Sequence, residues 1–250
     1  MCLNNWGGID HKVLEFHEYV NLFSGKSGSG KSTVMDAIQV ILYGSFSPSF
    51  LNKAADDAKN RRSVLSYLRG EQKDGSANRK DCDFCSVIAL EIEDTGTHII
   101  TCIGIAFEVR KSDSEIKKFV YFSHSGKMPE SEYLTEQGVC YSNQEIKKLV
   151  SARTKSDDNR GKGEVNRIYG SKEAYLGTLY DVILGYIDQN RFITMEKSAI
   201  ALKMTNGTGQ FIRDYMFPKN TSNTIATISE QLDSYRQIKD KIENLRKRIE

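Results

Sequence analysis

The hydrophobic pattern near the start of the chain predicts a strand, a turn and a helix in immediate succession. Tyr19 to Phe23 is a short, mostly apolar run that leads directly into a glycine-rich segment. Apolar residues then recur at gaps of three and four, which is the spacing of one helical face. These residues are Val34, Ala37, Ile38, Ile41 and Leu42. Gly44 is expected to end this helix as its C-cap.

A polar segment and three strand-like runs follow this helix. The stretch from Phe46 to Asn78 is rich in turn formers, so we interpret it as an excursion from the core with a short helix around Arg61 to Leu68. Alternating apolar positions then mark three strands separated by turn residues. The strands are expected at Ser86 to Glu93, His98 to Arg110 and Lys117 to His124. This order predicts an antiparallel β-meander.

Two further helices are predicted after the meander. Ser142 and Glu145 have the spacing of a capping box ahead of an apolar stripe. Ser171 is expected to cap a later helix that continues through Leu184 and ends at Gly185. Between them, Ser156 to Gly163 is charged and rich in glycine, which indicates a flexible loop.

The last part of the chain has a different pattern. Apolar residues recur at gaps of three and four with charges between them, which predicts the start of a coiled coil. They are Ile225, Ile228, Leu232, Tyr235, Ile238, Ile242, Leu245 and Ile249. An ordinary amphipathic helix packed on the domain is the alternative. We therefore divide the chain into residues 1–221, the main domain, and residues 222–250, the start of a coiled-coil arm.

Composition changes this picture little. The chain has 250 residues, of which 39% are hydrophobic, and a net charge of +2, so one globular domain is the default and no global excess of charge points to a partner. No apolar run approaches the ~20 residues of a membrane span. The five cysteines form no disulfide framework and no secretory leader opens the chain, so a cytoplasmic protein without membrane contact is expected.

The glycine-rich segment carries the strongest chemical signal. Residues Gly25 to Ser32 satisfy the G-x-x-x-x-G-K-[ST] pattern at every fixed position, between an expected strand and an expected helix. Such a P-loop surrounds phosphates with backbone N–H groups, while Lys31 reaches the β- and γ-phosphates and Ser32 binds Mg²⁺. The expected ligands are ATP and Mg²⁺, and the expected binding residues are Gly25, Lys26, Ser27, Gly28, Ser29, Gly30, Lys31, Ser32 and Thr33.

A second acidic Mg²⁺ ligand, which hydrolysis requires, is harder to find. Ser86 to Asp94 ends in a carboxylate but favours an ordinary sheet strand, and Tyr180 to Asp188 favours the end of a helix. A self-sufficient P-loop kinase or nucleotide hydrolase should carry this residue and is therefore the alternative function. A third possibility is an interaction module with a degenerate nucleotide site, against which the intact Lys31 and Ser32 argue.

The order of these features resembles the N-terminal half of an SMC-like ABC ATPase head, an α/β P-loop fold. Particular strings resemble the MukB-like branch and the JetC type found in Wadjet plasmid-defence systems. They are Asn5-Trp6-Gly7, the P-loop followed by Thr33 to Gln39, Asn52 to Ala55 leading into Ser66 to Gly70, and Gln210 to Met216. The run before Asn5 leaves little room for a first core strand, and a signature motif is absent, as expected of an N-terminal half.

This resemblance implies partners and further site residues. The implied partners are the C-terminal half of the same head, a second copy in an ATP-sandwiched homodimer, double-stranded DNA, and kleisin-like and nuclease subunits. It makes Gln210 the candidate Q-loop glutamine, catalytic with Lys31 and bound to Mg²⁺, with a plain loop glutamine as the alternative and Gln189 as a rival. Arg69 is placed near nucleotide or DNA, or on the solvated surface. Asn5 and Trp6 are placed beside adenine, or in the core.

Two weaker signals complete the set. Cys82 and Cys85 have zinc-ligand spacing, but no second pair or nearby histidine supports a four-ligand site. Basic residues in and after the excursion are candidates for contacts with a phosphate backbone, although a solvated surface is the simpler interpretation. These residues are Lys59, Arg61, Arg62, Arg69, Lys73, Arg79 and Lys80.

Overall fold

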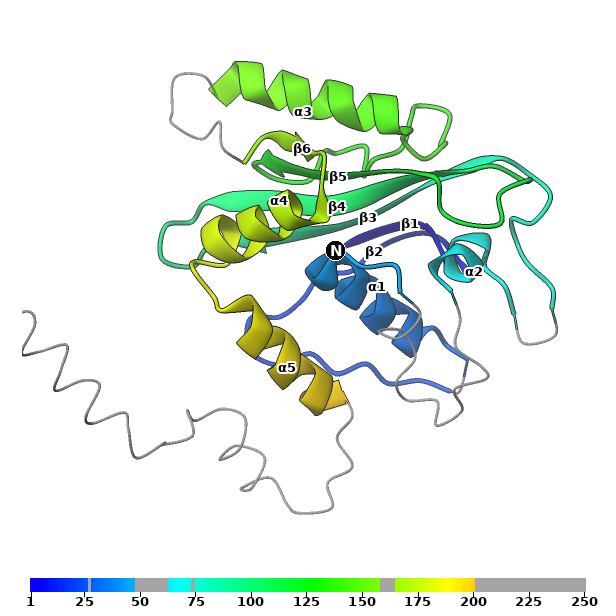
Figure 1. Cartoon of the computed structure of the whole chain (residues 1–250), viewed down its shortest axis with the longest axis horizontal. Coiled ribbons are helices and arrows are strands. Elements are labelled where there is room, and N and C mark those ends of the chain that lie inside the picture. The colour runs from blue at the N-terminus through cyan, green and yellow to red at the C-terminus, as the bar shows by residue number, and fades with distance from the viewer. Residues whose placement is uncertain (27, 48–62, 73–74, 158–164, 201–250) are drawn as a thin grey trace, which may run out of the picture. The chain divides into compact units, whose positions relative to one another are not determined.

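The computed structural model describes residues 1–26, 28–47, 63–72, 75–157 and 165–200 (Figure 1). By its internal contacts the chain divides into two units, Met1–Ile193 and Thr194–Glu250. Almost all described elements belong to the first unit. The predicted coiled coil and the predicted boundary after residue 221 lie outside the described residues. None of the described helices has the length and hydropathy that crossing a bilayer requires.

The first unit is built on a six-stranded, fully antiparallel sheet (Figure 1). The strand order is β2-β1-β3-β4-β5-β6, and the register places Ile88 opposite Ile105 and Ala106 opposite Val120. The strands are β1 (Cys2–Trp6), β2 (Ile9–Val13), β3 (Phe84–Glu93), β4 (Ile100–Val109), β5 (Lys118–Ser125) and β6 (Arg167–Tyr169). The predicted meander is therefore confirmed as β3-β4-β5, within an α/β fold.

Successive residues of each strand point to opposite faces of the sheet, so each face has its own hydrophobic core. Ile88, Ile103 and Ile105 belong to the first, while Val87 and Ala106 belong to the second. Strands β3 and β4 are central and covered on both faces. This is why apolar residues occupy consecutive positions in them instead of alternating with polar ones.

Helices α1 (Lys31–Tyr43), α2 (Val64–Arg69) and α4 (Lys172–Gly177) contribute to the first core. Helix α1 confirms the predicted apolar spacing, and Gly44 ends it in the left-handed conformation with φ 52°. Three buried phenols satisfy carbonyls at this end of α1, which otherwise have no helical donor. Tyr121 donates to Gly44 O at 2.6 Å, Tyr175 to Ile41 O at 2.9 Å and Tyr180 to Leu42 O at 3.0 Å.

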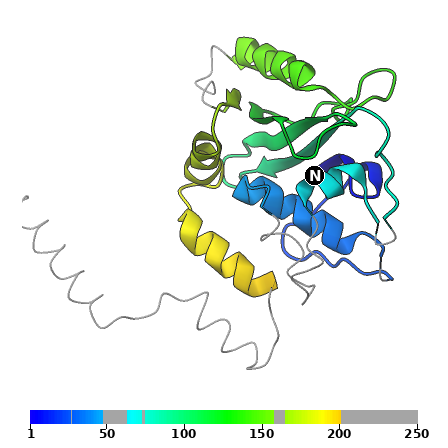
Figure 2. The ribbon, with the colours of Figure 1, turned by 45° about the vertical axis from the view of Figure 1, so that its right-hand side comes forward.

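Helix α3 (Asn143–Asp157) covers the opposite face of the sheet (Figures 1 and 2). Its predicted capping box is confirmed: Ser142 Oγ accepts from the Glu145 N–H at 3.3 Å, and the Glu145 carboxylate accepts from the Ser142 N–H at 2.7 Å. Ile146 and Val150 are buried in the second core. The helix therefore presents its remaining, polar side to solvent.

The segment after Ser171 only partly follows the prediction. Ser171 caps α4 by accepting from the Ala174 N–H at 3.2 Å, and Gly185 stops the segment with φ 73°, as expected. However, residues Thr178–Ile183 form a π-helix instead of continuing α4. Such wide turns are rare and tend to be local. A further helix, α5 (Gln189–Ile200), was not predicted.

Two strand predictions near the start are wrong. Residues 14–25 contain neither strand nor helix, so Tyr19 to Phe23 is not a strand, and no described strand pairs with it. A strand needs a partner for its N–H and C=O groups, which local sequence cannot supply. Conversely, the short run before Asn5 does form a complete strand, because β1 lies between β2 and β3.

Candidate nucleotide-binding site

The P-loop leads into the start of α1, and its backbone is exposed. Gly28 and Gly30 have φ values of 85° and 88°, a region that side chains disfavour, and a Cβ at either would meet no atom within 4 Å. The glycines are therefore required by backbone conformation, and the space in front of them is open to a ligand. Ser27 lies outside the described residues.

The Lys31 side chain folds back over this loop. Its Nζ donates to the carbonyls of Gly25 at 2.7 Å and Lys26 at 3.0 Å, and approaches Ser29 Oγ at 3.3 Å. A lysine ammonium has three donors and no acceptor, so all three of its protons point toward the loop. The positive charge is thus held at the place where the phosphates of a P-loop ligand bind.

The first turn of α1 is suited to an anion and its metal. It contains no acidic residue, and its N–H groups and dipole favour negative charge. Ser32 is exposed in this turn, so its hydroxyl is accessible to a cation beside the phosphates. These residues fit a nucleoside triphosphate with Mg²⁺. Gln210 lies outside the described residues, and its role stays a prediction.

Trp6 belongs to the core and not to an adenine pocket, and Asn5 beside it is half-buried. Trp6 is fully buried and stacks on Tyr67, with ring centroids 5.1 Å apart and an angle of 8° between the planes. Its Nε1–H donates to the backbone carbonyl of Thr33 at 2.8 Å. The Asn5 side chain donates to Cys85 O at 2.7 Å. A base has no access to this indole, so the core alternative is the correct one.

The basic residues that the structure describes do not form one patch. Arg79 is buried and donates to the carbonyls of Leu68, at 2.9 Å, and Gly7. Burial lowers the pKa of its guanidinium, and the carboxylate of Asp10 opposes that shift. Arg69 donates to the carbonyls of Lys111 at 3.1 Å and Asp113 at 2.6 Å. Only Lys80 is exposed; Lys59, Arg61, Arg62 and Lys73 lie outside the described residues.

The two acidic candidates, Asp94 and Asp188, both lie in connecting segments. Ser86 to Asp94 largely coincides with β3, an ordinary sheet strand, as predicted. Asp94 accepts from the N–H groups of Thr97 and Gly96, both at 2.8 Å, and these bonds lower the pKa of its carboxyl. Asp188 accepts from the Arg191 N–H at 2.7 Å at the start of α5. Both carboxylates therefore serve as acceptors for backbone N–H groups close to them in sequence.

The cysteines show no metal site. Cys82 is exposed and Cys85 half-buried, and burial raises the pKa of the Cys85 thiol to about 11. Within the described part of the chain, no three histidine, cysteine or acidic side chains are grouped closely enough to hold a metal ion.

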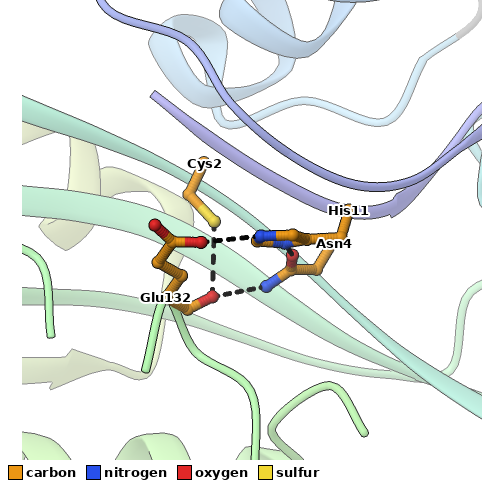
Figure 3. Close-up of polar contacts among 4 residues, drawn as sticks. All are labelled: Cys2, Asn4, His11 and Glu132. Carbon is orange, nitrogen blue, oxygen red and sulfur yellow. Dashed lines mark hydrogen bonds and ion pairs between the residues drawn. The ribbon is translucent and has the colours of Figure 1, made fainter. Parts of the chain in front are cut away.

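A polar cluster that the sequence did not reveal joins the β1–β2 hairpin to the loop before α3 (Figure 3). His11 lies between Asn4 Oδ1 and Glu132 Oε2, each 2.6 Å from a ring nitrogen, and the Asn4 amide donates to Glu132 O at 2.8 Å. Cys2 Sγ also faces Glu132 O, at 3.4 Å, and burial raises the pKa of its thiol to about 12. The thiol does not contact the imidazole, so this cluster is a structural link and not a nucleophilic site.

The glycine-rich loop, its lysine and the helix that follows define a P-loop nucleotide-binding protein of the α/β class. The chain belongs to the AAA domain family, whose sequence profile matches residues 1–250. This membership supports an ATPase-type nucleotide-binding domain of the ABC and SMC-like kind, in a family that generally binds ATP with Mg²⁺. No curated protein matches the sequence.

Proposed function

We propose that this chain is the ATP-binding N-terminal part of an SMC-like ATPase head that acts on DNA, of the JetC type that extrudes DNA loops in Wadjet anti-plasmid defence. The observation that carries the nucleotide part is the Lys31 ammonium, held over an exposed glycine loop at the start of α1. The JetC assignment is supported by the sequence motifs described above, whereas membership of the AAA domain family supports the broader assignment to an ATPase head.

Each part of the site has a defined task in this proposal. The N–H groups of the loop and of the first turn of α1 bind the phosphates, and Lys31 exchanges its carbonyl contacts for β- and γ-phosphate oxygens. Ser32 binds Mg²⁺, which neutralises charge on the phosphates when bound. Gln210 positions the attacking water and senses the metal.

Hydrolysis in this proposal requires the C-terminal half of the head. Residues before the P-loop are apolar yet exposed, with Tyr19 79%, Val20 78% and Leu22 88% accessible. Exposed apolar side chains of this kind are suited to being covered by another part of the protein, which the proposal assigns to the C-terminal half. The same half contributes the second acidic ligand and the signature motif, and two heads enclose two ATP molecules between them.

Binding to double-stranded DNA is supported by the outer side of α3. Lys147, Lys148 and Lys155 are exposed there, although the whole chain has a net charge of only +2. Lys147 and Lys155 are two turns apart, about 12 Å along the helix, and no salt bridge was found for either within the described residues. Kleisin-like and nuclease subunits complete the proposed assembly.

A self-sufficient P-loop kinase or nucleotide hydrolase is the alternative function. Such an enzyme needs its catalytic carboxylate in this chain, and the two described candidates, Asp94 and Asp188, accept hydrogen bonds from nearby backbone N–H groups instead.

Measuring the binding and turnover of Mg²⁺-ATP by this 250-residue chain separates the two functions. The proposal expects binding with little turnover, and Lys31→Ala should weaken binding at least tenfold, because charge-assisted contacts to phosphate exceed about 1.5 kcal/mol. Lys12→Ala is the control, since it removes one exposed lysine charge on β2, outside the P-loop. Rapid turnover by the isolated chain supports the self-sufficient enzyme.

A further inference from the structure

The first two turns of α1 are held on their buried side by side chains from outside the P-loop. Trp6, on β1, donates its indole N–H to the carbonyl of Thr33, directly after Lys31 and Ser32. Tyr67, on α2, donates its hydroxyl to the carboxylate of Asp36, one turn further along α1. The two rings stack on each other in nearly parallel planes. Both hydrogen bonds and the stack therefore form one connected group.

The backbone around this aromatic pair is packed too closely to adjust. A Cβ on Gly7 would lie 2.5 Å from Thr33 Cγ2, and a Cβ on Gly70 would lie 2.6 Å from Gly7 O. The Gly7 N–H donates to Tyr67 O at 2.8 Å. Arg79 joins the same backbones by donating to the carbonyls of Gly7 and Leu68. The β1–β2 turn, α2 and the start of α1 are thus tightly packed against one another as one rigid unit.

We propose that Trp6 and Tyr67 are positioning residues for nucleotide binding: they fix the first turns of α1 so that Lys31 and Ser32 meet the phosphates and Mg²⁺ without rearrangement of the helix backbone. This rests on the nucleotide binding proposed above. A bonded and buried indole keeps the Thr33 backbone in one place, and the Tyr67–Asp36 bond prevents the next turn from rotating. The site is thereby already ordered in the folded protein, so binding loses less conformational entropy and the affinity for nucleotide is higher.

The opposite end of α1 provides a matched control. Tyr180 donates its hydroxyl to Leu42 O at 3.0 Å, in the last turn of the helix and far from the P-loop in sequence. Trp6→Phe removes one N–H donor from a helix carbonyl near the P-loop. Tyr180→Phe removes one O–H donor from a helix carbonyl at the other end. A general loss of α1 stability affects both variants, whereas positioning of the phosphate site affects only the first.

The experiment measures Mg²⁺-ATP affinity by calorimetry for the wild-type chain, Trp6→Phe, Tyr67→Phe and Tyr180→Phe. We expect Trp6→Phe and Tyr67→Phe each to weaken binding about threefold to tenfold, the effect of one lost hydrogen bond, and Tyr180→Phe to change it less than twofold. Tyr67→Phe keeps the indole and the stack, so it tests the proposal even when Trp6→Phe does not fold.

A spectroscopic measurement provides an independent readout. Trp6 is the sole tryptophan of the chain, so its emission reports on one site. Because the backbone around the indole is already in place, saturating Mg²⁺-ATP should leave this emission nearly unchanged in the wild type. Equal losses of affinity in Trp6→Phe and Tyr180→Phe, or a large change of emission when calorimetry shows ATP bound, would overturn the positioning role. If the wild type binds no ATP, the proposed function itself fails.

Discussion

At the scale of single residues, His11 and His124 each have both ring nitrogens in hydrogen bonds, but with different partners. His11 has one ring nitrogen 2.6 Å from Asn4 Oδ1 and the other 2.6 Å from the Glu132 carboxylate. His124 is fully buried, with Nδ1 3.1 Å from Ser125 O and Nε2 2.9 Å from the hydroxyl of Tyr133. Because a carbonyl only accepts, Nδ1 of His124 carries the proton and Nε2 accepts from Tyr133. This arrangement suits the neutral ring.

His124 predicts a loss of stability in acid. Burial lowers its pKa below the ordinary 6.5, so the unfolded chain binds this proton more readily than the folded one. Its contribution is complete above about pH 6.5 and is lost as the pH falls toward the lowered folded pKa, at no more than about 1.4 kcal/mol per pH unit. The free energy of unfolding, measured by chemical denaturation between about pH 5 and 8, should fall less steeply toward acid pH in His124→Gln than in the wild type.

The control for this prediction is His98→Gln, because the His98 side chain is 79% accessible and its contact with Glu93, at 3.1 Å, lies on the surface. His98→Gln should follow the wild-type curve. A difference between wild type and His124→Gln that is the same at every pH would contradict the predicted role of the buried neutral ring.

At the scale of elements, local patterns predicted what local interactions determine. The apolar stripe of α1, the capping box of α3 and the three strands of the meander were all predicted, because helix caps, helix faces and hairpins depend on neighbours in sequence. The strand at Tyr19 to Phe23 was predicted wrongly and β1 was underestimated. Both depend on pairing with distant segments, as β1 pairs with β3.

The same limit applies to the candidate site. The P-loop residues were identified from spacing, since their chemistry requires fixed residue types. The contact of Trp6 with Thr33 joins residues 27 positions apart, and His11 and Glu132 are 121 apart, so no local pattern announces either. Composition alone suggested that Arg79 was a surface charge, whereas the fold buries it among backbone carbonyls.

Helix α3 predicts where the proposed DNA contact lies. Replacing both Lys147 and Lys155 with alanine should weaken binding of a double-stranded DNA fragment. It should also reduce the slope of log K against log salt concentration by about 2, one for each lost phosphate contact. The control replaces Lys111 and Lys117, which lie 3.7 and 3.6 Å from the carboxylates of Asp81 and Asp113. An equal effect in both double variants would show only a general response to charge and would argue against α3.

At the scale of the whole molecule, the exposed apolar segment before the P-loop predicts an association. Tyr19→Ser and Leu22→Ser together should change the unfolding free energy of the isolated chain by less than about 1 kcal/mol, because both side chains are already exposed. The same pair should abolish binding to the separately expressed C-terminal half of the proposed head, measured by titration.

Val139→Ser is the control for this association, since Val139 is also exposed, at 60%, but follows β5 on the chain and precedes α3. It should leave the association intact. Retained binding by the Tyr19 and Leu22 double variant would mean that the C-terminal half does not use this segment.

The pairing of β1 with β3 also has a consequence for the order in which the protein folds. Hairpins β3-β4 and β4-β5 join neighbouring segments, whereas the pairing of Cys2 with Ala89 closes a loop that contains the P-loop, α1 and α2. Closing so long a loop costs entropy before any contact compensates for it, so this pairing is expected late, after the meander. The binding site would then be the last part of the unit to mature, and a newly made chain would acquire its sheet before its affinity for nucleotide.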